Sequence, residues 1–242
     1  MIETLAVLLV VFVGVFTQSL AGFGSALVAM ALLPGLIGVQ AATPLVAILA
    51  LTTEVSLLYH YRLALNLSAI RTAAAASIAG IPLGIWALRG IPEGIFLAGL
   101  GVVLVGYALY GFLKLKLPAL QSAAWGYGFG FLAGLLGGAY NTSGPPIVIY
   151  ASCRGWAPAE FKSNLQGFFI INSTLVVLSH LLVQNMTPTV WRLYLWSLPV
   201  LALGILLGTR LDARIPHETF RKLVLGLLLL MGLRLVIQAF TG

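Results

Sequence analysis

Eight long apolar segments run through the chain, separated by short stretches that contain glycine, proline or charged residues. An α-helix needs about 20 apolar residues to cross the hydrocarbon core of a bilayer. Only 8% of the residues are charged, whereas soluble proteins have about a quarter. The sequence therefore predicts an all-α polytopic membrane protein. The eight segments lie near residues 3–20, 43–61, 70–88, 93–113, 121–137, 163–183, 191–209 and 219–240.

Two shorter apolar segments lie between the long ones. Residues 24–37 contain Pro34 and Gly35, and residues 144–153 open with Gly144, Pro145 and Pro146. At about 1.5 Å of rise per residue, neither reaches across a hydrocarbon core of about 30 Å. We expect two broken or re-entrant helices.

The chain contains an internal repeat. With a shift of 124 residues, eight positions between Gly80 and Leu109 are identical without a gap. A shift of 116 residues places the glycine-rich stretch 22–25 on 138–141, so each short segment follows a break at an equivalent place. Duplicated halves are common in transporters, whose substrate site lies between them. We predict two homologous halves, 1–113 and 121–242, joined by a connector at 114–120, in one membrane domain.

Basic residues predict the orientation of the halves. If both short segments change sides, ten of the thirteen Lys and Arg residues fall on one side, which by the positive-inside rule is the cytoplasm. The halves are then inverted repeats of five passes each, with both termini outside. The ten are Arg62, Arg71, Lys114, Lys116, Arg154, Lys162, Arg210, Arg214, Arg221 and Lys222; the other three are Arg89, Arg192 and Arg234.

Charge and cysteine content exclude several other classes. The net charge of +7 comes from scattered helix-end residues without a basic run, so we expect no nucleic-acid partner. Cys153 is the only cysteine and has no metal-binding spacing around it, so no metal or cofactor is expected. Trp86, Trp125, Trp156, Trp191 and Trp196 lie near expected helix ends and are typical of membrane-interface anchors.

Two glycine-rich motifs resemble a known family. The stretch AGFGSALVAMALLPGLIG (21–38) and its partner GLLGGAYNTSGPPIVIYASCRGW (134–156) are similar to the paired signatures of the sulfite exporter TauE/SafE family. The resemblance, which includes the size and two-half hydropathy of the whole chain, implies a multi-pass transporter of the bacterial inner membrane. It implies sulfite, sulfoacetate or other organosulfonate anions as substrates. Both termini are then expected in the periplasm.

The same two motifs indicate an anion site. Glycine at membrane depth permits the backbone to bend and expose N–H groups, and helix N-termini carry unsatisfied donors and a partial positive charge. Close helix packing is the alternative role of these glycines. The candidate ligands are Gly22, Phe23, Gly24 and Ser25 at the first break and Asn141, Thr142, Ser143 and Gly144 at the second.

Polar residues within the apolar segments add further candidates. Glu54 is the only acidic residue well inside a long apolar run. Desolvation disfavours a charged carboxylate, which suits a proton-coupling role, whereas pairing with a neighbour is the alternative. Asn172 falls near the repeat position of Glu54, and Gln18 lies beside the first break, so both are candidates for the cavity wall. Arg154 and Lys162 flank the second short segment, where they either attract anions or anchor helix ends.

Three classes of function remain. A secondary active transporter that works by alternating access accounts for the repeat, the paired breaks and Glu54, with a small anion and protons as partners. A passive anion channel or a transporter of a non-sulfur carboxylate is the alternative. An enzyme is not expected, because the sequence has no HExxH motif, no paired catalytic cysteine and histidine, and no phosphate-binding loop.

Overall fold

A computed structural model of the chain describes residues 2–87, 91–113, 118–212 and 217–241. Within these ranges all regular structure is helical, which confirms the all-α prediction. The helices are α1 (Ile2–Ala21), α2 (Ser25–Leu32), α3 (Pro34–Ile37), α4 (Val39–Tyr61), the 3₁₀ turn η1 (Arg62–Ala64), α5 (Leu67–Ala87), α6 (Glu93–Leu113), α7 (Trp125–Tyr140), α8 (Gly144–Arg154), α9 (Pro158–Leu182), α10 (Pro188–Leu211) and α11 (His217–Thr241).

Each predicted long segment corresponds to one of the helices α1, α4, α5, α6, α7, α9, α10 and α11. Among the described residues, six of these are long and apolar enough to cross a membrane: α1, α4 with η1, α5, α6, α9 and α10. Helix α7 has only 16 residues. Helix α9 begins at Pro158 rather than at 163, because proline fits the first helical turn, where an N–H has no partner.

Both predicted short segments form helices, and these helices are too short to cross a membrane. Helix α2 has 8 residues and α8 has 11, so they extend roughly 12 and 16 Å at about 1.5 Å per residue. The break before α2 uses positive φ angles at Gly22 (84°) and Gly24 (114°), which glycine adopts without a steric penalty. The break before α8 places Asn141 in the left-handed region, at φ 56°.

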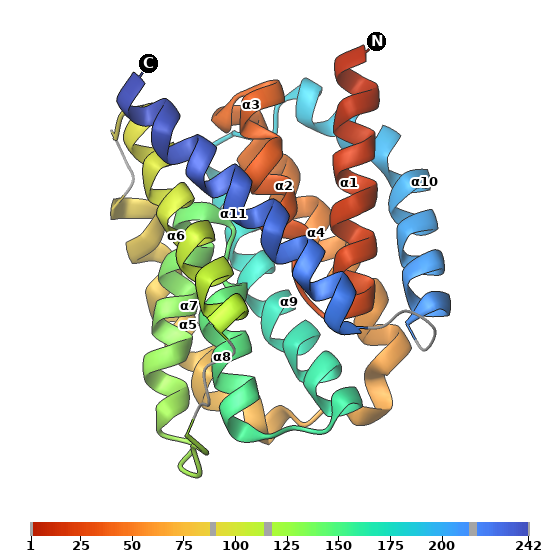
Figure 1. The fold of residues 1–242 in the computed structure, drawn as a ribbon, viewed down its shortest axis with the longest axis vertical. Coiled ribbons are helices and arrows are strands. Elements are labelled where there is room, and N and C mark those ends of the chain that lie inside the picture. The colour runs from red at the N-terminus through yellow and green to blue at the C-terminus, as the bar shows by residue number, and fades with distance from the viewer. Residues whose placement is uncertain (1, 88–90, 114–117, 213–216, 242) are drawn as a thin grey trace.

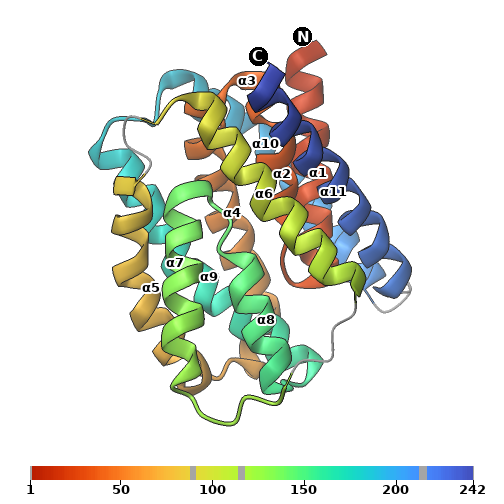
Figure 2. The same cartoon turned by 60° about the vertical axis from the view of Figure 1, so that its left-hand side comes forward.

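Helices at equivalent places in the two halves run in opposite directions. Helices α4 and α9 pack together, and Figures 1 and 2 show them antiparallel, as α1 and α7 also are. In both views α1 begins and α11 ends at the same end of the molecule, at the top. The described helices therefore have the directions that an inverted arrangement requires.

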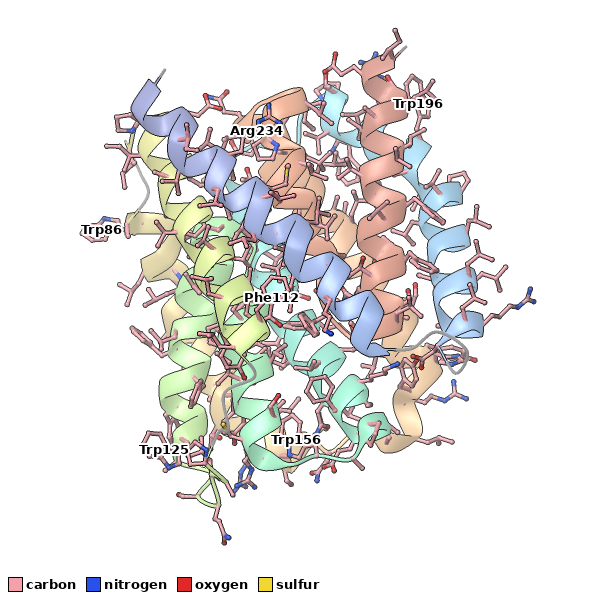
Figure 3. The ribbon with its side chains drawn as sticks, viewed as in Figure 1. Trp86, Phe112, Trp125, Trp156, Trp196 and Arg234 are labelled. Atoms are coloured by element: carbon pink, nitrogen blue, oxygen red, sulfur yellow. The ribbon has the colours of Figure 1, made fainter. Side chains whose placement is uncertain are left out.

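Most described cations lie toward the other end, which we call the cation-rich end. Helices α4, α8 and α10 end there, and α5, α9 and α11 begin there (Figure 1). Arg234 lies in the upper part of the molecule (Figure 3). The cations on these helix ends are Arg62, Arg71, Arg154, Lys162, Arg210, Arg221 and Lys222; Arg89, Lys114, Lys116 and Arg214 lie outside the described residues, as does most of the connector.

Helices at equivalent places in the two predicted halves also make equivalent contacts. Helix α5 packs along α7, and its counterpart α10 packs along α1. Gly80 and Gly84 lie against the backbone of α7, where a Cβ at either position would clash with a carbonyl oxygen. Gly204 and Gly208 lie against Val15 and Ser19 of α1. Both small-residue pairs therefore permit close helix packing, as small residues do in membranes.

Tryptophans lie toward both ends of the molecule. Figure 3 shows Trp125 and Trp156 at the cation-rich end and Trp86 and Trp196 in the upper part. Trp86, Trp125 and Trp196 each expose more than half of their surface. This distribution agrees with two aromatic belts at membrane interfaces.

Candidate functional site

The two helix breaks meet at a small internal cavity. Its walls come from α1, α2, α4, α7, α8, α9 and the loop between α7 and α8. The cavity volume is about 30 Å³, room for roughly one or two water molecules. The lining residues are Gln18, Gly24, Ala26, Leu27, Ala50, Glu54, Gly137, Asn141, Thr142, Ser143, Gly144, Phe169, Asn172, Ser173 and Val176.

Three buried polar atoms of this lining have no hydrogen-bond partner among the described residues. They are Oε2 of Glu54, Oγ1 of Thr142 and Oδ1 of Asn172. Their side chains are 4%, 0% and 2% exposed, respectively. A buried polar atom without a partner costs about 1–3 kcal/mol, so three in one cavity point to a ligand or water there.

Glu54 contributes the one ionisable side chain among the described residues that line the cavity. It comes from α4, and its Oε1 accepts a hydrogen bond of 3.0 Å from the hydroxyl of Ser173 on α9. Among the described residues, no lysine or arginine lines the cavity. An anion bound here would therefore rely on hydrogen-bond donors and helix N-termini rather than on a cationic side chain.

Asn172 lines the cavity from α9, near the position that the repeat predicts. Its Nδ2 donates to Oγ of Ser77 at 3.1 Å and to the carbonyl of Phe168 at 3.3 Å, which holds the amide in place. A Cβ at Gly137 would lie 3.1 Å from Asn172 Oδ1 and 3.3 Å from the Cβ of Ser143. The absence of a side chain at Gly137 therefore keeps this part of the cavity open.

The first break is held by glutamine side chains. Gln18 Oε1 accepts hydrogen bonds from the hydroxyl and the backbone N–H of Ser25, and Gln18 Nε2 donates to Gln166 Oε1 at 3.0 Å. Gln166 Nε2 donates to the carbonyl of Gly22 at 2.6 Å. Ser25 is therefore occupied within the protein, and the N–H groups nearest the cavity in α2 are those of Ala26 and Leu27.

The second break is held by Asn141. Its Nδ2 donates to the carbonyl of Thr43 at 2.9 Å, which ties the end of α7 to α4. The N–H groups of Asn141 and Thr142 bond back to the carbonyls of Gly137 and Leu136. Pro145 and Pro146 have no N–H, so the first turn of α8 offers fewer backbone donors than the first turn of α2.

Most sequence-predicted site residues lie on this cavity. Gln18, Gly24, Asn141, Thr142, Ser143, Gly144 and Asn172 line it together with Glu54. Gly22, Phe23 and Ser25 do not: Gly22 and Ser25 bond to the glutamines, and Phe23 packs edge-on against Tyr107. Ser173 is a lining residue that we did not predict; the available signal was its place directly after Asn172 within an apolar segment.

A larger cleft opens beside the cavity at the upper end. Its volume is about 920 Å³, and its walls come from the ends of α5, α7 and α9 and the beginnings of α4 and α6. Asn141 lines both the cleft and the cavity. The cleft, which we call the vestibule, therefore approaches the cavity at Asn141.

One face of α9 connects these features. Lys162, Gln166, Phe169, Ser173, Val176 and His180 recur at intervals of three and four residues, which places them on one side of a helix. Phe169, Ser173 and Val176 line the cavity, and His180 lines the vestibule. From Lys162 to His180 the helix rises roughly 27 Å, close to the thickness of a hydrocarbon core of about 30 Å. Helix α9 therefore contributes to the walls of both the cavity and the vestibule.

Comparisons with known proteins agree with this architecture. The family model of the sulfite exporter TauE/SafE family matches residues 6–235. A protein of Cupriavidus necator described as a probable sulfite/organosulfonate exporter TauE is 26% identical over 237 residues, which are 95% of this chain and 92% of that protein. No solved structure matches the chain. A match over nearly the whole length means that this chain belongs to the sulfite exporter TauE/SafE family of membrane transporters.

Proposed function

We propose that the chain is a secondary active transporter of small anions, with sulfite or an organosulfonate as the substrate. The observation that carries the proposal is the cavity between the two helix breaks. Glu54, Thr142 and Asn172 line this cavity, and each has a buried polar atom without a hydrogen-bond partner among the described residues. The family and the exporter from Cupriavidus necator support the substrate class.

An oxyanion in this cavity can be bound without a cationic side chain. The Thr142 hydroxyl donates one hydrogen bond. Asn172 adds an NH₂ donor only when its amide turns over, which breaks its present bonds to Ser77 and Phe168. The first turn of α2 adds backbone N–H groups and the positive end of a helix dipole. Protonated Glu54 adds an O–H donor, whereas ionised Glu54 repels the anion.

Transport follows from motion of the two halves around this site. We propose that residues 1–113 and 121–242 are inverted repeats that alternately open the cavity to either end. The antiparallel pairs α1 with α7 and α4 with α9 support the inverted relation, and the vestibule at the upper end supports alternate opening. Since the present cavity holds only one or two waters, it must widen to admit an oxyanion.

A binding measurement on purified protein tests the site. Thr142→Val and Asn172→Leu keep the side-chain size but remove the polar atom, so we expect each to weaken sulfite and methanesulfonate binding by about tenfold to a hundredfold, the worth of a hydrogen bond to a charged group. Thr209→Val is the control, because its hydroxyl bonds only within α10, to the carbonyls of Ile205 and Leu206. Unchanged affinity in both cavity variants would refute the site.

A further inference from the structure

A partly buried ion pair lies at the cation-rich end. Lys162 Nζ, at the beginning of α9, lies 2.5 Å from Asp212 Oδ2, at the end of α10. The two side chains are only 12% and 24% exposed. The Tyr61 hydroxyl, at the end of α4, donates to the same oxygen at 3.4 Å, and the Lys162 ammonium lies 5.5 Å from the Tyr61 ring centre. Three helices from both halves therefore meet at one lysine.

The ion pair lies directly below the first helix break. A Cβ at Gly22 would be 3.0 Å from Cγ of Lys162, so the lysine stem packs against the break. One turn further along α9, Gln166 bonds to the Gly22 carbonyl and to Gln18, which lines the cavity. Polar groups therefore continue from the cavity through Gln18 and Gln166 to Lys162.

Helix α4, like α9, has one face whose residues reach from the vestibule to the ion pair. Thr43 lines the vestibule, Ala50 and Glu54 line the cavity, and Tyr61 contacts Asp212, all at spacings that share one helix face. The paired faces of α4 and α9 thus lead from the vestibule through the cavity to the ion pair. Along this line of residues, which we call the path, the vestibule measures about 920 Å³ and the cavity about 30 Å³, and the ion pair lies beyond the cavity at the cation-rich end.

A lysine with this surrounding has two possible anionic partners. Asp212 holds it in the closed arrangement, and a substrate anion on the same path would compete for the same ammonium. A partly buried lysine without a counter-charge is costly, so the lysine does not release Asp212 until another anion replaces it. Opening of this end and anion binding are thereby coupled.

We propose that Lys162 is a substrate-binding residue at the cation-rich end and that Asp212 is the internal anion that it exchanges for the substrate. The proposal rests on the proposed function, because it assumes that an anion travels this path. It assigns Lys162 a role beyond helix anchoring, and it assigns Asp212 the role of closing the path in the absence of substrate.

One arm of the test measures closure without any substrate. In a Cys153→Ala background, Ala26→Cys places a thiol on the cavity wall, and a membrane-impermeant thiol reagent is added from the cation-rich side of oriented vesicles. We expect Asp212→Asn and Lys162→Gln to raise the labelling rate by about tenfold or more, because each removes the charge pair. Arg71→Gln, which removes an exposed cation at the same end, should leave the rate unchanged.

The second arm separates binding from closure. Methanesulfonate transport from the same side should show a KM raised about tenfold or more in Lys162→Gln and an unchanged or lower KM in Asp212→Asn. The exchanged pair Lys162→Asp with Asp212→Lys should restore slow labelling but keep the raised KM, whereas a purely structural ion pair would recover both. Circular dichroism and monodisperse elution establish that each variant folds.

The outcomes separate this proposal from the proposed function. Unchanged labelling in both single variants would overturn closure by the ion pair, and an unchanged KM in Lys162→Gln would overturn substrate binding by Lys162. If the unaltered protein transports no anion, the proposed function fails and the substrate role of Lys162 with it, while the labelling rates still decide whether the pair closes the path.

Discussion

Glu54 is the residue whose charge most affects the proposed site. The residue is 4% exposed, and it shares a cavity of about 30 Å³ with the atoms that we propose bind an anion. Two negative charges at such short range in a low-dielectric site repel each other strongly. Anion binding and protonation of Glu54 therefore favour each other, which is a coupling between two ligands of one protein.

We expect methanesulfonate affinity to decrease as the pH rises, because ionised Glu54 excludes the anion. Methanesulfonate keeps one charge across the neutral range, so its own titration does not contribute. Glu54→Gln imitates the neutral acid and should make the affinity independent of pH, as measured by calorimetry on purified protein. Glu3→Gln, at the exposed start of α1, is the control and should keep the pH dependence. Equal pH dependence in Glu54→Gln would contradict the coupling.

The sequence indicates some site residues more directly than others. Glu54 stands out because an acid inside an apolar segment is expensive, and Asn172 follows from the repeat. Thr142 and Asn141 follow from the glycine-rich break. The role of Ser25 is not readable from sequence, because its bonding to Gln18 depends on Gln166, which is distant in the chain. The contact between Lys162 and Asp212 is not readable from the sequence for the same reason. The two residues are 50 positions apart, one on α9 and the other at the end of α10.

At the level of elements, helix α7 depends on a row of glycines. Gly126, Gly130, Gly134 and Gly138 recur every four residues and face α5. A Cβ at Gly134 would clash with the carbonyl oxygen of Ser77, whose hydroxyl accepts a hydrogen bond from Asn172. The close contact of α5 and α7 therefore positions Asn172 as well as packing the helices.

Two alanine substitutions in α7 test this contact. We expect Gly134→Ala to destabilise the protein by about 1–3 kcal/mol, because overpacking forces the helices apart. Gly128→Ala is the matched control: a Cβ there meets nothing within 4 Å, and alanine favours the helix by about 0.5–1 kcal/mol over glycine. Thermal unfolding in detergent should show a lower midpoint for the first and an equal or higher midpoint for the second. Equal midpoints for both would contradict the packing.

Hydropathy predicts the elements well and their ends less well. All eight long helices and both short ones appear near the predicted residues, since apolar length and glycine breaks are local properties. The start of α9 is missed because Glu160 and Lys162 make its first turns polar. Those turns are polar because they contact Asn66 and Asp212 rather than lipid, which hydropathy does not reveal.

At the level of the whole molecule, the described helices have the directions that the proposed inverted repeat requires, and the two ends of the proposed path differ. The vestibule of about 920 Å³ lies at one end, and the Lys162–Asp212 pair, which we propose closes the path, lies at the other. Alternating access requires the opposite combination as well, in which the ion pair opens and the vestibule closes at Asn141. A passive channel would instead need both ends open together.

Transport by the purified protein in sealed liposomes tests the central claim most directly. Radiolabelled methanesulfonate and sulfite are supplied with and without an imposed pH gradient, and empty liposomes and Thr142→Val serve as controls. The proposed function predicts that the anion accumulates inside the liposomes above its external concentration and that uptake saturates. The accumulation should last only while the pH gradient lasts, and it should be much weaker in Thr142→Val. Equilibration to equal concentrations regardless of the gradient, or no flux of either anion, would contradict it.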